Sequence, residues 1–196
     1  VEHDRAIGKI RDICKSAEIP VIAAGNIKRV EDVKKLIYAG CARVVLNFSK
    51  ESNIELLEEV SRRFGKDRMV ISISDFKEFT ENQQLIEEYA DRILALDTLQ
   101  GEIAAISNIP IILHTDESSN DKIMKLLEDP AVSGLCGAYV SSMEVDLHAL
   151  KESCEKAGIP VNTFKSNIAW SDFKLNSDGM VPVIVQDYRT DEVLML

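Results

Sequence analysis

The stretch from Ile19 to Lys50 constrains the fold more than any other, because its pattern predicts one complete strand–helix–strand unit. It opens with IPVIAA, a short apolar run typical of a buried parallel strand. The segment EDVKKLIYAG then carries apolar residues at helical spacing and ends on Gly40, a common helix terminator. ARVVLNF is a second buried run. Two parallel strands joined by a helix need a connection of about this length, so the stretch predicts one unit of a parallel α/β sheet.

Apolar runs and helical patterns continue to alternate beyond this unit and predict six consecutive parallel strands with helices outside. Ser49 or Ser52 is available as the N-cap of the helix after the first unit, and Thr80 as that of a later one. The expected strands span residues 20–24, 42–47, 69–74, 92–96, 109–114 and 134–140. The other expected helices span residues 1–17, 54–64, 80–90, 101–106, 120–128 and 145–157.

No strand precedes the first expected helix, whereas every helix of a βα repeat follows a strand. We therefore expect the chain to begin within a fold, with two strands of an eight-stranded barrel lying before Val1. The predicted fold class is α/β, a (βα)8 TIM-barrel-like domain over residues 1–163 that is incomplete at its N-terminus. A candidate internal repeat favours a domain of two similar halves: AEIPVIAAG begins at residue 17 and SNIPIILHT at residue 107. The alternative is that the two strand-forming segments resemble each other by chance.

Composition limits the classes of partner and site. The formal net charge of −10 disfavours binding to nucleic acid or to an anionic membrane. No run is long and apolar enough for a membrane span or a signal peptide, so we expect a cytoplasmic location. The three histidines are scattered, and no metal site is expected within this chain. The cysteines match no metal or redox spacing and are expected to be buried free thiols: Cys14, Cys41, Cys136 and Cys154.

The opening unit resembles the histidine-biosynthesis (βα)8 barrels, namely phosphoribosylformimino-AICAR-phosphate isomerase and the cyclase subunit of imidazole glycerol phosphate synthase. The similarity lies in AGNI, EDVKKLI, AGCARVVLN and SKESN. It implies that two loops offer backbone N–H groups to one phosphate of a phosphoribosyl-type small molecule, or to phosphate itself. Two glycines of the family pattern are absent, while Lys28 and Lys50 add positive charge. The matching phosphate-binding residues are Gly25, Asn26, Ile27, Asn47, Phe48 and Ser49.

The same resemblance implies two aspartates on opposite strands as general acid and general base. One belongs to a strand outside this chain. The other matches Ser74, at the end of MVISIS, with Asp75 one residue later. Two roles stay open for Asp75: entry into the site through a bulge, or capping of the next helix. Asp97, after the following strand, is likewise a candidate catalytic residue or a loop cap.

A second, weaker phosphate site is implied at the ends of the last two strands, at Thr115, Ser141 and Ser142. The family uses glycine-rich loops there, whereas this chain has Asp116 and Glu117 beside Thr115. One like-charge pair at ~4 Å and an effective dielectric near 20 costs about 4 kcal/mol. A helix N-terminus offers only ~0.3–1 kcal/mol. We therefore do not expect a bisphosphate to bind at both ends.

Residues 164–196 no longer alternate helix and strand. SDG predicts a turn, and VPVIVQD and EVLML predict an antiparallel hairpin joined by YRTD. The run from Asp178 to Met195 resembles the amino-terminal segment of phosphoribosyl-AMP cyclohydrolase, a domain often fused to phosphoribosyl-ATP pyrophosphatase. Asp191 replaces the usual turn glycine. We expect a linker and the first hairpin of such a domain, whose zinc and magnesium ligands would lie downstream of Leu196.

Three hypotheses follow. In the first, the chain is part of a multifunctional histidine-biosynthesis hydrolase, and its barrel-like region is degenerate. That region would then be a scaffold, a dimerisation element that forms a homodimer, or a regulatory phosphoribosyl binder. In the second, it is an active isomerase or cyclase barrel, which needs a working aspartate pair. In the third, it is a non-enzymatic phosphate-binding or dimerisation module.

Overall fold

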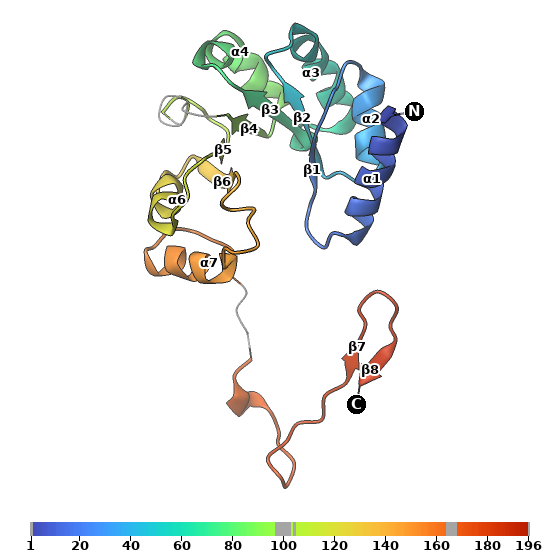
Figure 1. Ribbon diagram of the computed structural model, residues 1–196, viewed down its shortest axis with the longest axis vertical. Helices are drawn as coiled ribbons and strands as arrows, with labels where there is room; N and C mark the ends of the chain where they lie inside the picture. The colour runs from blue at the N-terminus through green and yellow to red at the C-terminus, as the bar shows by residue number, and fades with distance from the viewer. Residues whose placement is uncertain (1, 97–102, 104, 164–167, 196) are drawn as a thin grey trace. The chain divides into compact units, whose positions relative to one another are not determined.

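The computed structural model describes residues 2–96, 103, 105–163 and 168–195. The chain divides into two compact units, Val1–Val161 and Asn162–Leu196. The first unit is a six-stranded parallel sheet whose strands follow one another in chain order, with helices packed against it (Figure 1). The predicted α/β fold with six consecutive parallel strands is thereby confirmed. β1 and β6 form the two edges of the sheet.

Each strand is three to five residues long, and most are followed by a helix that packs on the sheet. The strands are β1 (Ile22–Ala24), β2 (Arg43–Asn47), β3 (Met69–Ile73), β4 (Arg92–Ala95), β5 (Ile111–His114) and β6 (Val132–Cys136). The helices are α1 (Glu2–Ser16), α2 (Val30–Tyr38), α3 (Glu51–Phe64), α4 (Phe76–Tyr89), α6 (Asn120–Leu127) and α7 (Leu147–Lys156), with a 3-10 turn at Lys66–Arg68. The helix expected at residues 101–106 falls mostly outside the described residues.

The sixth strand begins and ends earlier than predicted. The ladder pairs Ile111 with Val132 but Ile112 with Gly134, so one extra residue of β6 is accommodated there as a bulge. Gly137 then adopts φ +150°, and the amide of Ser141 donates to its carbonyl at 3.2 Å. Residues 137–140 therefore form a turn, and their assignment to a strand was wrong because glycine permitted a reversal that the apolar letters did not indicate.

The fourth helix begins four residues before the predicted start. Asp75 is its N-cap, and the Asp75 carboxylate accepts a hydrogen bond from the amide of Lys77 at 2.7 Å. Thr80 lies inside the helix, where its hydroxyl donates to the Lys77 carbonyl at 3.2 Å. The Thr80 N-cap prediction was wrong because Asp75, directly after β3, already supplies the acceptor that a helix N-terminus needs.

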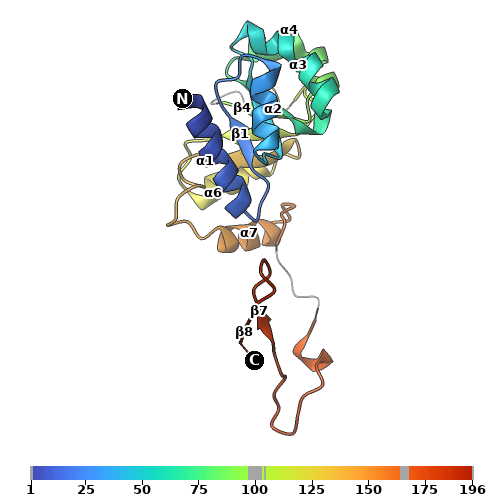
Figure 2. The same cartoon turned by 90° about the vertical axis from the view of Figure 1, so that its right-hand side faces the viewer.

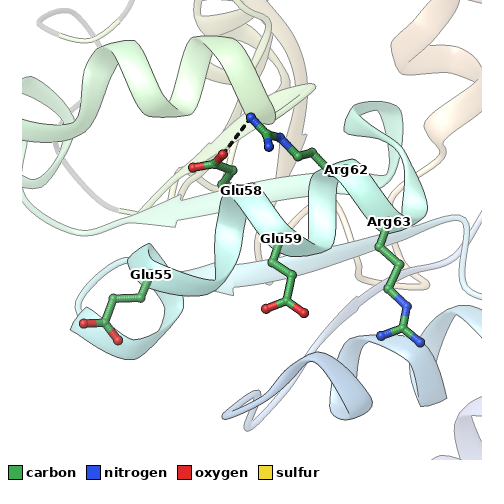
Figure 3. Close-up of a pocket in the computed structure, with 5 residues that line it drawn as sticks. All are labelled: Glu55, Glu58, Glu59, Arg62 and Arg63. Carbon is green, nitrogen blue, oxygen red and sulfur yellow. Dashed lines mark ion pairs between the residues drawn. The ribbon is translucent and has the colours of Figure 1, made fainter.

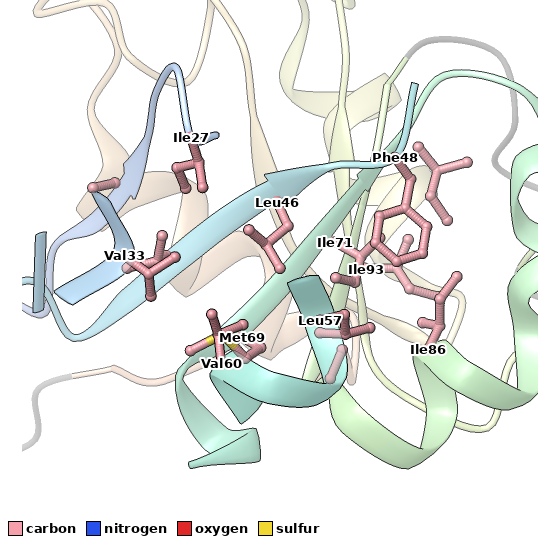
Figure 4. Packing of buried hydrophobic residues seen from close by; sticks show 14 of the residues in the cluster. Ile27, Val33, Leu46, Phe48, Leu57, Val60, Met69, Ile71, Ile86 and Ile93 are labelled. Carbon is pink, nitrogen blue, oxygen red and sulfur yellow. The ribbon is translucent and has the colours of Figure 1, made fainter. Parts of the chain in front are cut away.

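The core lies between the sheet and the helices (Figure 4). Alternate residues of β2 and β3 face the helices, so Leu46 of β2 and Ile71 of β3 pack with Leu57 and Val60 of α3. Each of these four side chains is fully buried. Burial of one such side chain contributes roughly 1.5–3 kcal/mol. α1 lies beside α2 (Figure 2), and its Ile7 joins the same core.

A charged cluster joins the amino-terminal ends of the strands. One carboxylate oxygen of Asp91, Oδ2, accepts from Arg43 Nε at 3.0 Å and from Arg92 Nε at 2.8 Å. Arg92 Nη1 also donates to the Ser133 hydroxyl at 3.5 Å. Burial tends to raise the pKa of Asp91, but the hydrogen bonds and charges of Arg92 and Arg43 outweigh it, so the pKa lies below its ordinary value. This cluster ties the starts of β2, β4 and β6 together.

The second unit contains a 3-10 turn at Trp170–Asp172 and a two-stranded antiparallel sheet of β7 (Val185–Gln186) and β8 (Val193–Met195). The predicted hairpin is confirmed. Asp191 has φ 59°, in the left-handed region that favours glycine, and it stands where the resemblance places the turn glycine. None of the described helices in either unit is both long enough and apolar enough to cross a membrane.

Candidate functional site

Three loops meet at the carboxyl edge of the sheet, after β1, β2 and β3. Lys50 Nζ donates to the side-chain oxygen of Asn26 at 3.4 Å, which connects the first loop to the second. The hydroxyls of Ser49 and Ser74 lie 3.0 Å apart, which connects the second loop to the third. The parallel register places these loops side by side, because neighbouring parallel strands end at the same edge. The structure therefore brings together residues from both predicted phosphate loops and from the predicted acid position.

Most backbone N–H groups of the loop after β1 already donate hydrogen bonds to groups of this loop or of α2. The amide of Ile27 donates to the Gly25 carbonyl at 3.0 Å, and the Ile27 side chain is buried in the core. The amides of Lys28 and Arg29 donate to the carboxylate of Asp32, at 3.1 and 3.2 Å. Asp32 is only 7% exposed. It thus occupies the N-terminus of α2, a role that an acidic residue three positions after the N-cap commonly takes.

The loop after β2 leaves its helix N-terminus open. Asn47 accepts from the Ser49 amide at 2.9 Å, and the Phe48 amide donates to the Ser72 carbonyl at 3.1 Å. Lys50 is the N-cap of α3, and within the described part of the chain its side chain makes no cap hydrogen bond to this helix. The prediction that Ser49 or Ser52 is the N-cap was wrong, because the short turn after Phe48 places Lys50 at that position.

Asn53 lies beneath this open helix end and is 1% exposed. Its side-chain nitrogen donates to the Asn47 carbonyl at 3.1 Å and holds the loop against the first turn of α3. Its side-chain oxygen is buried without a hydrogen-bond partner among the described residues. Sequence reasoning missed Asn53, because a polar residue in a first helical turn is usually solvated and its burial depends on the tertiary fold.

A carboxylate does reach the end of β3, but it comes from Glu78. The Ser74 amide donates to Glu78 Oε2 at 2.9 Å, and the Ser74 hydroxyl donates to Glu78 Oε1 at 3.3 Å. Asp75 faces the α4 amides as a cap, one of the two roles considered for it. The Asp-x-x-Glu spacing from Asp75 to Glu78 is a recognisable helix-start signal that could have located Glu78. Asp97 lies outside the described residues.

The fold does not require a glycine at position 25 for steric reasons. The φ of Gly25 is not in the left-handed region, and a Cβ built on it would meet no atom within 4 Å. By contrast, Gly40 has φ +107°, and its Cβ would lie 2.9 Å from Cys14 Cβ. The fold therefore requires a glycine at position 40, whereas at position 25 it leaves open space beside the backbone.

The residues of the second predicted phosphate site each make hydrogen bonds within their own loop. Thr115 is buried, and its hydroxyl accepts from the Glu117 amide at 3.1 Å. The Ser142 hydroxyl accepts from the Glu144 amide at 3.2 Å, and the Ser141 amide donates to a turn carbonyl. The helix that follows, α7, is already capped by the carboxylate of Asp146, which accepts from two of its amides at 3.0 Å.

A separate hollow of about 460 Å³ lies on the outer face of α3 (Figure 3). All five lining side chains come from this one helix, and Glu58 pairs with Arg62 at 2.7 Å. The lining side chains carry charges of both signs and do not converge on one point where a ligand could bind. Among the described residues, no group of three or more His, Cys, Asp or Glu side chains is placed to hold a metal ion.

Comparison with known families identifies the first unit. A family model described as "Histidine biosynthesis protein" matches residues 2–106, more than half of the chain. The chain belongs to this histidine biosynthesis family. The matched segment contains all three loops at the carboxyl edge of β1 to β3, so the geometry described above belongs to the family part of the chain. The resemblance of the opening unit to the histidine-biosynthesis barrels is confirmed.

Three distant relatives share the name "Imidazole glycerol phosphate synthase subunit HisF". The protein of Buchnera aphidicola is 33% identical over 84 residues, which cover 43% of this chain and 33% of the relative. That of Streptococcus sanguinis is 23% identical over 193 residues, covering 82% of this chain and 77% of the relative. That of Helicobacter hepaticus is 23% identical over 184 residues, covering 78% and 73%. The chain thus spans one third of the first relative's length and about three quarters of the other two. The cyclohydrolase resemblance of the hairpin stays a prediction.

Proposed function

We propose that the first unit is a non-catalytic phosphate binder within a histidine-biosynthesis enzyme. It binds a phosphoribosyl-type small molecule through a single phosphate, held where β1 and β2 end. The observation that supports this most directly is the contact between Lys50 and Asn26 at the N-terminus of α3, where the N-cap residue Lys50 makes no side-chain cap to the described residues. The α2, α4 and α7 N-termini each hold one of their own carboxylates, whereas α6 also lacks a side-chain cap among the described residues but has Ser119, an uncharged residue, at its N-cap.

The charge balance favours an anion at α3. A helix N-terminus carries roughly half a positive charge and stabilises an anion by about 0.3–1 kcal/mol at an exposed site. Lys50 adds a full charge within the same loop. The first-turn amides of Glu51 and Ser52 point toward this end of the helix, as amides at every α-helix N-terminus do. Asp32 occupies the neighbouring α2 terminus, so the phosphate depends on the α3 loop, and we expect an affinity in the millimolar range.

Absence of turnover follows from the residues at the end of β3. The family resemblance places a catalytic acid at position 74, where this chain has Ser74. Glu78 supplies a carboxylate nearby, but that carboxylate accepts hydrogen bonds from the Ser74 amide and hydroxyl. Because the Glu78 carboxylate accepts hydrogen bonds from the Ser74 amide and hydroxyl at the start of α4, it is not directed at a substrate proton.

A second candidate function is an active barrel that makes imidazole glycerol phosphate. It is favoured by the name shared by the relatives and by the presence of the Glu78 carboxylate at the strand end. If it holds, purified chain turns over the cyclase substrate, and Glu78→Gln lowers the rate at least tenfold. No turnover above a protein-free blank would support the non-catalytic proposal.

For the second unit, the proposal is the opening hairpin of a phosphoribosyl-AMP cyclohydrolase domain within a longer protein. Such a domain uses zinc to activate water for attack on the purine ring, with magnesium as a second ion. The resemblance implies that the ligands of both ions lie elsewhere in that longer protein, and the hydrolysis is proposed for the longer protein. Hydrolysis of phosphoribosyl-AMP by the full-length protein, and not by this chain, is the expected result.

The binding proposal is tested by NMR titration of the chain with sodium phosphate, following the amides of residues 25–28 and 47–52. Saturable shifts confined to these amides, with a midpoint in the millimolar range, are expected. Gly25→Val should abolish them, because the added side chain fills the open space beside the loop. Gly8→Val is the matched control, since a Cβ at Gly8 on α1 also meets open space. Absence of shifts at tens of millimolar phosphate would show that the loops are scaffold.

A further inference from the structure

Cys14 and Cys41 form a close thiol pair that neither the family nor the proposed function assigns. Cys14 lies in the last turns of α1, and Cys41 lies between the end of α2 and the start of β2. Their sulfur atoms are 3.8 Å apart, although the residues are 27 positions apart in the sequence. The sequence alone gave no reason to pair them, because only the packing of α1 beside α2 brings them together (Figure 2).

Gly40 explains why the approach is so close. A Cβ at position 40 would lie 2.9 Å from Cys14 Cβ, so the glycine lets α1 rest against the turn that carries Cys41. A disulfide requires a sulfur–sulfur separation of about 2.05 Å. The two sulfurs therefore need to approach by less than about 2 Å for the bond to form.

We propose that Cys14 and Cys41 are a site of reversible intramolecular disulfide formation by exchange with a small-molecule disulfide of the oxidised glutathione class. In the first step the Cys14 thiolate attacks the small disulfide, forms a mixed disulfide and releases one small thiolate. In the second, the Cys41 thiolate attacks the Cys14 sulfur and releases the other. The pair is oxidised by two electrons, the small disulfide is reduced to two thiols, and these take up the two cysteine protons.

The different exposure of the two thiols sets this order. Cys14 is partly exposed, so the small disulfide reaches it first, whereas Cys41 is 1% exposed. Burial, and after it the hydrogen bond and charge of Cys14, together raise the pKa of Cys41 to about 11. Closure by Cys41 is therefore slow at neutral pH and accelerates as the pH rises. Cys136 and Cys154 belong to β6 and α7 and take no part in this pair.

The disulfide would close a ring that contains β1, α2 and the loop from Gly25 to Ile27. Cross-linking a segment of this length restricts the unfolded chain and typically stabilises the native state. For a chain of this size we expect Tm to rise by about 5–10 °C on oxidation and to fall back on reduction with dithiothreitol.

The test uses the full chain, incubated with oxidised glutathione, alkylated with iodoacetamide and digested with trypsin. The expected product links peptide 12–15 (DICK) to peptide 36–43 (LIYAGCAR), while Cys136 and Cys154 are alkylated. The link should form about tenfold faster for each pH unit between 7 and 9. Cys14→Ser should remove it together with the Tm shift, and Cys136→Ser should leave both unchanged.

Three results would overturn the inference. The first is glutathione that stays on Cys14 while Cys41 is alkylated at every pH. The second is a cross-link that involves Cys136 or Cys154. The third is a disulfide-linked dimer on a non-reducing gel in place of the internal link. Because the mapping is done on the unmodified sequence, none of these results depends on whether a cysteine variant folds.

Discussion

The hydroxyls of Ser49 and Ser74 lie 3.0 Å apart, although each belongs to a different strand–helix unit. This contact joins the phosphate loop to the position where the barrel family resemblance places an acid. Glu78 then accepts from the Ser74 hydroxyl and amide. The carboxyl end of β3 is thus a connected set of hydroxyls and one carboxylate, in which the carboxylate already has its hydrogen-bond donors.

Ser74→Asp should not restore a catalytic acid. The new carboxylate would lie beside Glu78, and two neighbouring carboxylates repel when both are ionised. Because Ser74 is exposed, we expect the free energy of unfolding to fall by only about 1 kcal/mol at pH 7. The loss should shrink toward pH 4, because protonation of the introduced carboxylate removes the repulsion. Urea unfolding at both pH values measures it, with Ser74→Asn as the uncharged control. Equal losses in the two variants would show that charge is not the cause.

Gly137→Ala should be among the most damaging single substitutions in the first unit. A Cβ there would lie 2.1 Å from the backbone oxygen of Thr115, and the residue has φ +150°. Neither the backbone atom nor the dihedral can adjust at low cost, so we expect a loss of about 2–4 kcal/mol. Gly25→Ala, whose Cβ meets open space, should change stability by less than about 1 kcal/mol. Chemical denaturation of both variants makes the comparison, and similar losses would contradict the packing described here.

Asp91→Asn should destabilise the chain in a pH-dependent way. The folded-state pKa of Asp91 lies below its ordinary value, so its stabilising contribution is complete above the unfolded-state pKa near 4. It is lost as the pH falls from there through the folded-state pKa. At pH 7 we expect a loss of about 1–2 kcal/mol, since two arginines lose their shared acceptor. The difference from the parent chain should shrink below pH 4. A pH-independent difference would point to packing instead of charge.

The fold could be predicted largely from the sequence, because apolar runs and helical periodicity report burial directly. The five strands up to His114 follow from those runs. The predicted element boundaries were wrong where a single residue ended a strand or began a helix. Gly137 ended β6, and Asp75 began α4 before Thr80 could. Both errors concern termini, where a single hydrogen bond decides the boundary.

The candidate site was less predictable, because its decisive contacts join strand–helix segments of the first unit that are distant in the sequence. Asp32 and Glu78 occupy positions where an acidic residue commonly satisfies a helix start, and this local pattern was available in the sequence. The burial of Asn53 and the contact of Cys14 with Cys41 depend on how helices pack, which no local pattern encodes. Sequence reasoning therefore located the loops but not which of their amides are already occupied.

Asp191→Gly should strengthen the hairpin of the second unit. The turn is closed by hydrogen bonds from the Asp191 amide to the Asp187 carbonyl at 2.9 Å and from the Asp187 amide to the Glu192 carbonyl at 2.8 Å. Asp191 adopts φ 59° to make them, a conformation that costs a side-chain residue about 1 kcal/mol relative to glycine. Asp tolerates this region better than Ala does, so hairpin order should rank Gly above Asp and Asp above Ala. Cross-strand nuclear Overhauser effects between Val185 and Met195, which pair in the ladder, measure that order. A weaker hairpin in Asp191→Gly than in Asp191→Ala would show that the aspartate side chain, not the backbone angle, holds the turn.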